Sequence, residues 1–352
     1  MSDLKPFSAP RGKPATLDDV AALAEVSPKT VSRVVNSEGG VHRATRERVL
    51  RAIELLDYKP NLNARVLAGD RSYTIVLFCE RPGGYLSDFQ AGASDRCRES
   101  GYHLVVEEWS RASPNAARHL MTLLRQLHPD GAVLLPPLSD DQLLCNALRE
   151  ASIPMVQIAP REPSADSPSI GIDDYLAARQ LTAHLLGLGH RRIGFIRGKS
   201  GHGAAEQRYR GFTDEMRDQG IPIEVALVEN GNFVFGDGVG CAERMLRAPA
   251  PPSAIFASND DMAAAVISVA HRMGLNLPSE LSVVGFDDAL IATMIWPLLT
   301  TVRQPVISMA RHAAGLIIDH PRRSGWPPTV ANTVFEFELV VRDSTSSAPC
   351  ST

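Results

Sequence analysis

Hydrophobic residues near the start of the chain recur with the spacing of a helix. Between residues 16 and 24, four of them fall on one face: Leu17, Val20, Ala21 and Ala24. Thr16 can cap the start of this helix, with Asp19 as its capping-box partner three residues later. The pattern predicts a first helix that stops near Glu25-Val26.

Two further helices are predicted after this stop. Ser27-Pro28 opens a second helix, Pro28–Asn36, because serine is a favoured N-cap and proline is tolerated at the first helical position. A third helix is expected from Thr45 to Asp57, and Pro60 ends it. Two short helices joined by a tight turn form a helix-turn-helix.

From Tyr73 onwards the pattern changes to short apolar runs separated by stretches of helical length. The expected strands are Thr74–Cys79, His103–Glu107, Gly131–Leu135, Met155–Ile158, Ile193–Ile196, Ala254–Ala257 and Ser282–Phe286. This alternation predicts an α/β core with parallel, doubly wound sheets. The pattern restarts near Asp173, so we expect two similar subdomains with a ligand cleft between them, at the carboxyl ends of the strands.

Charge is distributed unevenly along a chain of ordinary composition. Residues 1–71 hold 12 Lys and Arg against 9 Asp and Glu, whereas the remaining 281 residues hold 24 against 31. A mildly basic head on an acidic body suits an approach to a polyanion such as DNA.

Cysteine spacing and motif searches exclude several classes of protein. The five cysteines are scattered and include no C-x-x-C pair, which fits a reducing cytosol. No apolar run of membrane-spanning length and no secretory signal is present. Gly198-Lys199-Ser200 lacks the upstream glycine of a phosphate loop, and no zinc or nucleophile-elbow motif occurs. We therefore expect no enzyme activity, no cofactor and no metal.

The N-terminal head resembles the LacI/GalR family of bacterial transcriptional regulators. Residues 26–36 match the family pattern V-S-x-x-T-V-S-R-V-x-N at every fixed position. The resemblance implies that Pro28, Lys29 and Arg33 read bases in the major groove. It implies that a second group contacts the DNA backbone or supports the reading helix: Thr16, Ser27, Thr30, Ser32 and Asn36. His42 departs from the family, which usually has serine there, so we expect a weaker cap on the third helix.

A hinge segment follows the head. Residues 61–69 could form about two helical turns, too few to be stable alone in water. In the family this segment folds on operator DNA, and a leucine wedges into a minor-groove base step. The resemblance gives these roles to Asn61, Ala64 and Leu67; the alternative is a plain linker.

The resemblance continues through the core to about residue 343. It implies a periplasmic-binding-protein-like fold that closes on a small ligand, commonly a sugar. By position it assigns four effector-binding residues: Arg208, Asp287, Asn259 and Phe233. The simpler alternatives are a surface ion pair for Arg208 and a helix cap for Asp287.

The first subdomain departs from the family at two ligand-side loops. Ala159-Pro160-Arg161 replaces a usual Asp-Arg pair, and Glu80–Tyr85 lacks the common Asn-Pro-Phe pattern. Arg161 and Tyr85 are the expected substitutes as effector contacts.

The predicted organisation has five parts. A tail (1–14), a helix-turn-helix domain (15–60), a hinge (61–71), a core (72–343) and a second tail (344–352) follow one another. The first subdomain is expected to take about 72–170 and 303–328, and the second about 171–302 and 329–343.

These patterns predict a cytoplasmic, homodimeric repressor of a carbohydrate catabolic operon. It would bind pseudo-palindromic operator DNA, with an affinity that a sugar or sugar derivative changes. Two alternatives remain: a DNA-binding regulator controlled by a partner protein, without small-molecule sensing, and a cytosolic solute-binding protein. The effector, the operator and the choice between dimer and tetramer are not predicted.

Overall fold

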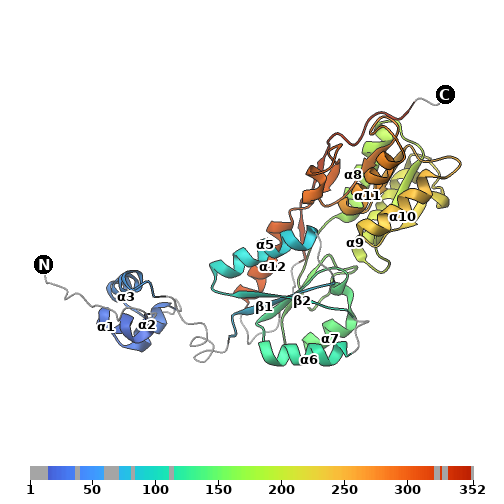
Figure 1. Ribbon diagram of the computed structural model, residues 1–352. Helices are drawn as coiled ribbons and strands as arrows, with labels where there is room; N and C mark the ends of the chain where they lie inside the picture. The colour runs from blue at the N-terminus through green and yellow to red at the C-terminus, as the bar shows by residue number, and fades with distance from the viewer. Residues whose placement is uncertain are drawn as a thin grey trace. The chain divides into compact units, whose positions relative to one another are not determined.

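The fold is taken from a computed structural model of the chain. It describes residues 15–35, 40–58, 71–80, 84–110, 115–320, 326 and 332–349. The chain divides into two compact units, a head up to Arg71 and a core from Ser72 onwards. Each unit is described by itself (Figure 1).

Three helices form the described part of the head: α1 (Leu17–Leu23), α2 (Pro28–Val35) and α3 (Arg43–Leu55). Val20, Val31 and Val49, one from each helix, are fully buried against one another. Their burial follows from the apolar stripe on each helix. Helix α3 starts and ends two residues earlier than predicted, because the turn Leu56-Asp57 already leaves the helical path.

The first subdomain of the core is built on a six-stranded parallel sheet of order β11-β5-β4-β3-β1-β2. Its strands are β1 (Thr74–Cys79), β2 (His103–Glu108), β3 (Gly131–Leu134), β4 (Met155–Ile158), β5 (Ser169–Ile172) and β11 (Asn332–Phe335). Its helices are α5 (Gly84–Glu99), α6 (Ala116–Leu127), α7 (Gln142–Glu150) and α12 (Val306–Asp319), with the short helix η1 (Leu138–Asp140).

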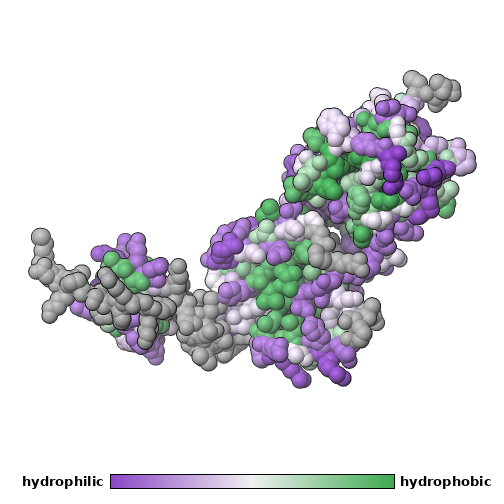
Figure 2. Space-filling view, in the orientation of Figure 1, coloured by the Kyte–Doolittle hydropathy of each residue, from purple (hydrophilic) through white to green (hydrophobic). Residues whose placement is uncertain are grey.

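Alternation along β1 explains why helices cover both faces of this sheet. Ile75 and Leu77 pack on the side of α5 and α12, whereas Val76 and Phe78 pack on the side of α6 and α7. The two pairs of helices lie on opposite sides of β1 and β2 (Figure 1). The outer surface of α6 is mostly hydrophilic, and apolar residues gather between the layers (Figure 2).

The second subdomain repeats this plan with a parallel sheet of order β7-β6-β8-β9. Its strands are β6 (Ile193–Arg197), β7 (Val228–Asn230), β8 (Ala254–Ala257) and β9 (Ser282–Val284). Its helices are α8 (Asp174–Gly187), α9 (Gly203–Asp218), α10 (Phe235–Leu246) and α11 (Asp260–Arg272), with the short helices η2 (Val225–Leu227) and η3 (Leu290–Thr293). The predicted doubly wound architecture is confirmed.

Two antiparallel strands, β10 (Thr301–Arg303) and β12 (Glu338–Val340), carry the chain between the subdomains. β10 leads from the second sheet into α12, and β12 leads from β11 back to the second subdomain. The prediction placed 329–343 in the second subdomain, but β11 extends the first sheet beside β5. The sequence analysis predicted neither β5 nor β11.

The predicted C-terminal tail starts too early. Ser344 is buried, and its hydroxyl donates to the carbonyl of Val283 at 2.6 Å while accepting the Thr300 N–H at 2.8 Å. The backbone carbonyl of Ser346 lies 3.1 Å from Nε2 of the buried His190. A segment rich in hydroxyls therefore packs against the second subdomain through side-chain as well as backbone hydrogen bonds, among them Val283 N–H to the Ser344 carbonyl at 2.9 Å.

Candidate functional site

Helix α2 of the head presents a polar face to solvent. Val31 and Val34 are buried, while Pro28, Lys29 and Arg33 are exposed. The predicted base-reading residues therefore share the outer side of one helix. This arrangement fits a helix that inserts into a DNA groove.

The residues at the helix starts have mainly structural contacts. The Thr16 N–H donates to Asp19 at 2.8 Å, and the Asp19 N–H donates to the Thr16 hydroxyl at 3.3 Å, so the predicted capping box is present. The Ser27 hydroxyl accepts the Thr30 N–H at 3.2 Å and lies 2.9 Å from the Thr30 hydroxyl. Ser32 is half-buried.

His42 stands at the N-cap of α3 and makes no side-chain capping hydrogen bond, which confirms the expected weak cap. Asn36 and the hinge residues Asn61, Ala64 and Leu67 lie outside the described residues.

A cavity of about 540 Å³ lies between the two subdomains of the core. Residues at or just after the carboxyl ends of β1, β6, β8 and β9 line it, as expected for doubly wound sheets. Five of the six predicted effector residues are in the lining: Tyr85, Arg208, Phe233, Asn259 and Asp287.

Arg208 is the centre of a buried charge cluster. Its Nε donates to Asp174 at 2.8 Å, and its Nη1 donates to the Ser258 carbonyl at 2.6 Å and lies 3.4 Å from Asp287. The guanidinium also stacks on the Phe286 ring at 3.6 Å. The Arg208 side chain is 5% exposed, so it is not a surface pair. Nη2 has no hydrogen-bond partner among the described residues and remains available to a ligand.

Asp287 is held beside Arg208 in a rare backbone conformation. Its φ is 111°, in the region that favours glycine, and such strain is often found at binding sites. Its carboxylate accepts from Gln304 Nε2 at 2.7 Å. Burial raises the pKa of Asp287 to about 6, although Arg208 opposes the rise. Asp287 caps none of the helices in the part of the chain that the structure describes.

Asn259 and Phe233 are joined by a hydrogen bond. Asn259 caps α11 by accepting the Met262 N–H at 3.1 Å, and its Nδ2 donates to the Phe233 carbonyl at 3.2 Å. Phe233 has a φ of 63°, and a Cβ on Gly198 would lie 2.0 Å from its ring. Because Gly198 has no side chain, the Phe233 ring fits against its backbone. This packing accounts for Gly198, which is not part of a phosphate loop.

The first subdomain contributes a largely apolar wall. Leu86, Leu135, Pro136, Pro137 and Ala159 line it. Its polar residues are Glu80 and Tyr85, and the hydroxyl of Tyr85, at the start of α5, has no hydrogen-bond partner among the described residues. Burial raises the pKa of Tyr85, and the charges of Asp287 and Asp174 raise it further, so these groups lie near one another.

Arg161 does not join the other predicted effector residues. Its guanidinium pairs with Glu206 at 2.8 Å, outside the cavity lining, and its side chain is 46% exposed. The prediction for Arg161 is therefore corrected: it bridges the loop after β4 and helix α9. Glu80 and Lys199 form a second ion pair between the subdomains, at the cavity.

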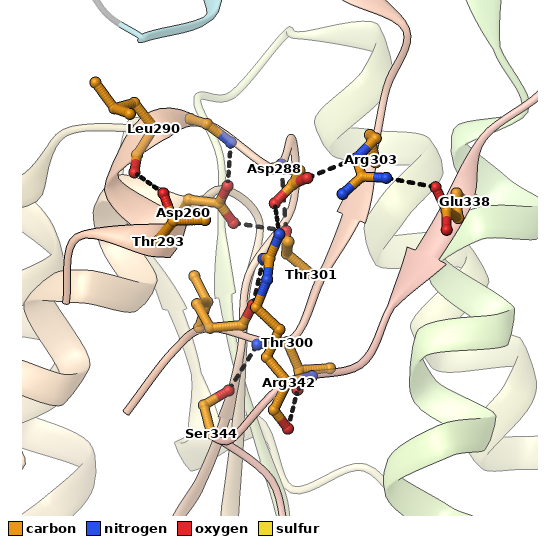
Figure 3. Close-up of polar contacts among 12 residues, drawn as sticks. Asp260, Asp288, Leu290, Thr293, Thr300, Thr301, Arg303, Glu338, Arg342 and Ser344 are labelled. Carbon is orange, nitrogen blue, oxygen red and sulfur yellow. Dashed lines mark hydrogen bonds and ion pairs between the residues drawn. The ribbon is translucent and has the colours of Figure 1, made fainter. Parts of the chain in front are cut away.

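The neighbours of Asp287 are tied to the strands that join the subdomains (Figure 3). Asp288 accepts from Arg303 Nε at 2.7 Å and from Arg342 Nη2 at 2.6 Å, and Arg303 also donates to Glu338 at 2.6 Å. This network links β10 to β12. Asp260 accepts from the Thr301 hydroxyl at 2.6 Å. Hydrogen bonds therefore join Asp260, in the cavity lining, and Asp288, next to Asp287, to the strands β10 and β12 that connect the subdomains.

Several lining residues escaped the sequence reasoning: Glu80, Asp174, Lys199, His202, Asp260, Asp261 and Gln304. Asp174 follows the missed strand β5, so its place at a strand end was hidden. Asp260 and Asp261 directly follow Asn259, and the ligand-side position of Asn259 could have indicated them.

Comparisons with known proteins agree with this geometry. The model for bacterial regulatory proteins of the lacI family matches residues 16–61, and that for the periplasmic binding protein-like domain matches residues 182–345. The transcriptional regulator DegA of Bacillus subtilis is 31% identical over 94% of this chain and 98% of its own.

Two solved structures share the fold. A complex of the transcriptional regulator CelR with cellobiose has a TM-score of 0.71 and 33% identity, over 94% of this chain and 99% of that chain. The lac repressor dimer bound to operator and an anti-inducer has a TM-score of 0.72 and 28% identity, over 95% and 100%.

A helix-turn-helix head joined to a two-subdomain core with a buried polar cavity defines a DNA-binding transcriptional regulator. The chain belongs to the LacI family of bacterial regulatory proteins. In its described part, no helix has the length and apolar character needed to cross a bilayer.

Proposed function

We propose that this protein is a cytoplasmic repressor whose affinity for operator DNA changes when a sugar binds in the core cavity. The observation that carries the proposal is the Arg208–Asp174–Asp287 cluster, which presents buried polar groups to a space large enough for a small ligand. Relatives are named as regulators or repressors, and a structure of one holds cellobiose. These names support regulation by binding over catalysis.

In the head, Pro28, Lys29 and Arg33 would meet base edges from α2, while Thr16, Ser27, Thr30, Ser32 and Asn36 would hold phosphates or support the helix. The exposure of Pro28, Lys29 and Arg33 on one helix supports the base-reading part of this division. Asn61, Ala64 and Leu67 would act in the minor groove, with Leu67 as the wedge.

A homodimer would place two such heads on a pseudo-palindromic site. The lac repressor is described as a dimer on operator DNA. This chain exposes large apolar side chains around η3, namely Leu290, Met294 and Trp296, each at least 70% exposed. Exposed apolar residues gathered in this way are typical of an interaction surface, and a second copy of the chain would cover them.

The network around Asp288 gives a route from ligand to DNA. A ligand that bridges Asp287 and Tyr85 contacts both subdomains, and Asp287 donates its N–H to the Val302 carbonyl of β10 at 2.9 Å. Binding would therefore favour one arrangement of the crossover strands.

The charged groups gathered in the cavity lining favour this function over control by a partner protein alone, which a cleft closed by apolar residues would fit better. To test the proposal, the full chain would select DNA from a random pool while its mass is measured by sedimentation. An inverted repeat bound by a dimer is expected. Selection of no sequence, or of a single unrepeated half-site by a monomer, would contradict the proposal.

A further inference from the structure

The charges in the cavity lining are unbalanced. The lining holds five carboxylates, those of Glu80, Asp174, Asp260, Asp261 and Asp287, but only two cations, Lys199 and Arg208. His202 adds no positive charge near neutral pH, because burial and then the charges of Arg208 and Lys199 lower its pKa to about 3.

Both cations are already committed to carboxylates of the lining. Arg208 bonds to Asp174 at 2.8 Å and lies 3.4 Å from Asp287, and Lys199 pairs with Glu80. An anionic ligand could still reach Nη2 of Arg208, but the positive charges of Arg208 and Lys199 are already offset by Asp174, Asp287 and Glu80.

Asp260 and Asp261 remain after these pairings. Asp260 is buried and has its own donors, the Thr301 hydroxyl at 2.6 Å and the Ala289 N–H at 2.7 Å. Asp261 differs, because its half-buried carboxylate forms no hydrogen bond or ion pair with any described residue. Asp261 is thus an open acceptor in the wall of the cavity.

Negative charge is already disfavoured in this space. Burial raises the pKa of Asp174, Asp260 and Asp261, and the charge of Asp261 helps to raise that of Asp287. The start of α11 could have attracted an anion through its helix dipole, but its first turn carries the carboxylates of Asp260 and Asp261. A further anion would meet repulsion in a poorly solvated site.

We propose that the effector is a polyhydroxylated sugar without an anionic group, and that Asp261 excludes sugar acids and sugar phosphates from the cavity. Hydroxyl groups donate hydrogen bonds, so they suit a lining rich in carboxylate acceptors. An amino group on the sugar would be tolerated as well. This inference rests on the proposed sugar-sensing function and narrows it to a charge class.

The test uses the full chain and compares neutral sugars with charged derivatives of the same sugars. Cellobiose would be compared with cellobionate, and glucose and galactose each with the corresponding amino sugar, uronate and 6-phosphate. Dissociation constants would come from thermal shift and calorimetry at pH 7.5. At least one neutral or amino sugar should bind, and its acidic counterpart should bind at least about tenfold more weakly.

Two variants locate the discrimination. Asp261→Asn keeps the size of the side chain and removes its charge. It should reduce, several-fold, the ratio of the dissociation constant of an acidic sugar to that of its neutral counterpart. Asp166→Asn removes an exposed carboxylate outside the lining and should leave the ratio unchanged.

The outcomes separate the two proposals. A uronate or phosphate that binds as tightly as its neutral counterpart would overturn the charge inference and leave sugar sensing intact. If Asp261→Asn leaves the ratio of these dissociation constants unchanged, Asp261 does not exclude anionic sugars. Binding of no probe of any charge would overturn the proposed sugar sensing, and this inference would fail with it.

Discussion

The head and the core place their candidate functional residues in opposite environments. On α2, Lys29 is exposed to solvent and forms no ion pair with any described residue. In the core, the Arg208 side chain is buried, bonds to Asp174 at 2.8 Å and lies 3.4 Å from Asp287. The head is therefore built to meet a large partner from outside, whereas the core surrounds a small one.

Because of this difference, substitutions in the head and in the core should affect binding and folding stability to different degrees. An exposed residue can be replaced at little cost to folding, since its partner lies outside the protein. A buried charge that loses its partner destabilises the whole unit. Substitutions in the two regions should therefore differ first in their effect on unfolding.

The largest expected effect comes from Arg208→Ala. It leaves Asp174 and Asp287 buried without their counter-charge, so the free energy of unfolding should fall by about 3–5 kcal/mol in urea titrations. Arg210→Ala is the matched control, because Arg210 is exposed two residues further along α9 and stacks on Tyr175. Equal losses for the two variants would remove the distinction between buried and exposed sites.

Asp287→Asn tests the same cluster through pH. Because the folded pKa of Asp287 is raised from 3.8 to about 6, its contribution to stability is fully present below about pH 4 and is lost as pH rises through 6. Between pH 4 and pH 7 the wild type should therefore lose about 3 kcal/mol relative to Asp287→Asn. Urea titrations across this range measure the difference, and a constant difference would contradict the raised pKa.

Lys29→Ala should have the opposite pattern to Arg208→Ala: a large effect on DNA recognition and a small one on the free energy of unfolding. Discrimination between a selected operator and the same operator with altered half-site bases should fall by about 1–3 kcal/mol. Unfolding should stay within about 0.5 kcal/mol of the wild type. Arg51→Ala, an exposed change on α3, is the control and should weaken binding to all sequences alike. Unaltered discrimination in Lys29→Ala would remove that residue from base reading.

The smallest expected effect is a gain in the stability of the head. His42→Ser supplies the side-chain cap that α3 lacks, so thermal unfolding of the head should show about 1 kcal/mol more stability. His42→Ala cannot cap and should give no gain. A gain of equal size in both variants would show that capping is not its cause.

The same contrast explains what the sequence could predict. Helices α1 and α2 depend on local patterns, the Thr16–Asp19 box and the Ser27-Pro28 start, so the starts of these two helices were predicted correctly. Strand β11 could not be placed from sequence because its partner β5 lies more than 150 residues earlier and both are short.

The cavity shows a similar limit. Arg208, Asp287, Asn259, Phe233 and Tyr85 were found through resemblance to a family. The partners that define their chemistry come from distant segments: Asp174 from the start of α8 and Gln304 from the end of β10. Arg161 was misplaced because it follows the position of the family's Asp-Arg pair, whereas in the structure it pairs with Glu206 of α9.

The central claim is that occupation of the core cavity changes the affinity of the head for DNA. Fluorescence anisotropy of a selected operator, titrated with the full chain with and without a saturating sugar that stabilises it, tests this directly. The account predicts a change in operator Kd of about 5- to 150-fold in the wild type and no change in Arg208→Lys, which cannot hold both carboxylates and the ligand. An operator Kd that the bound sugar leaves unchanged in the wild type would contradict it.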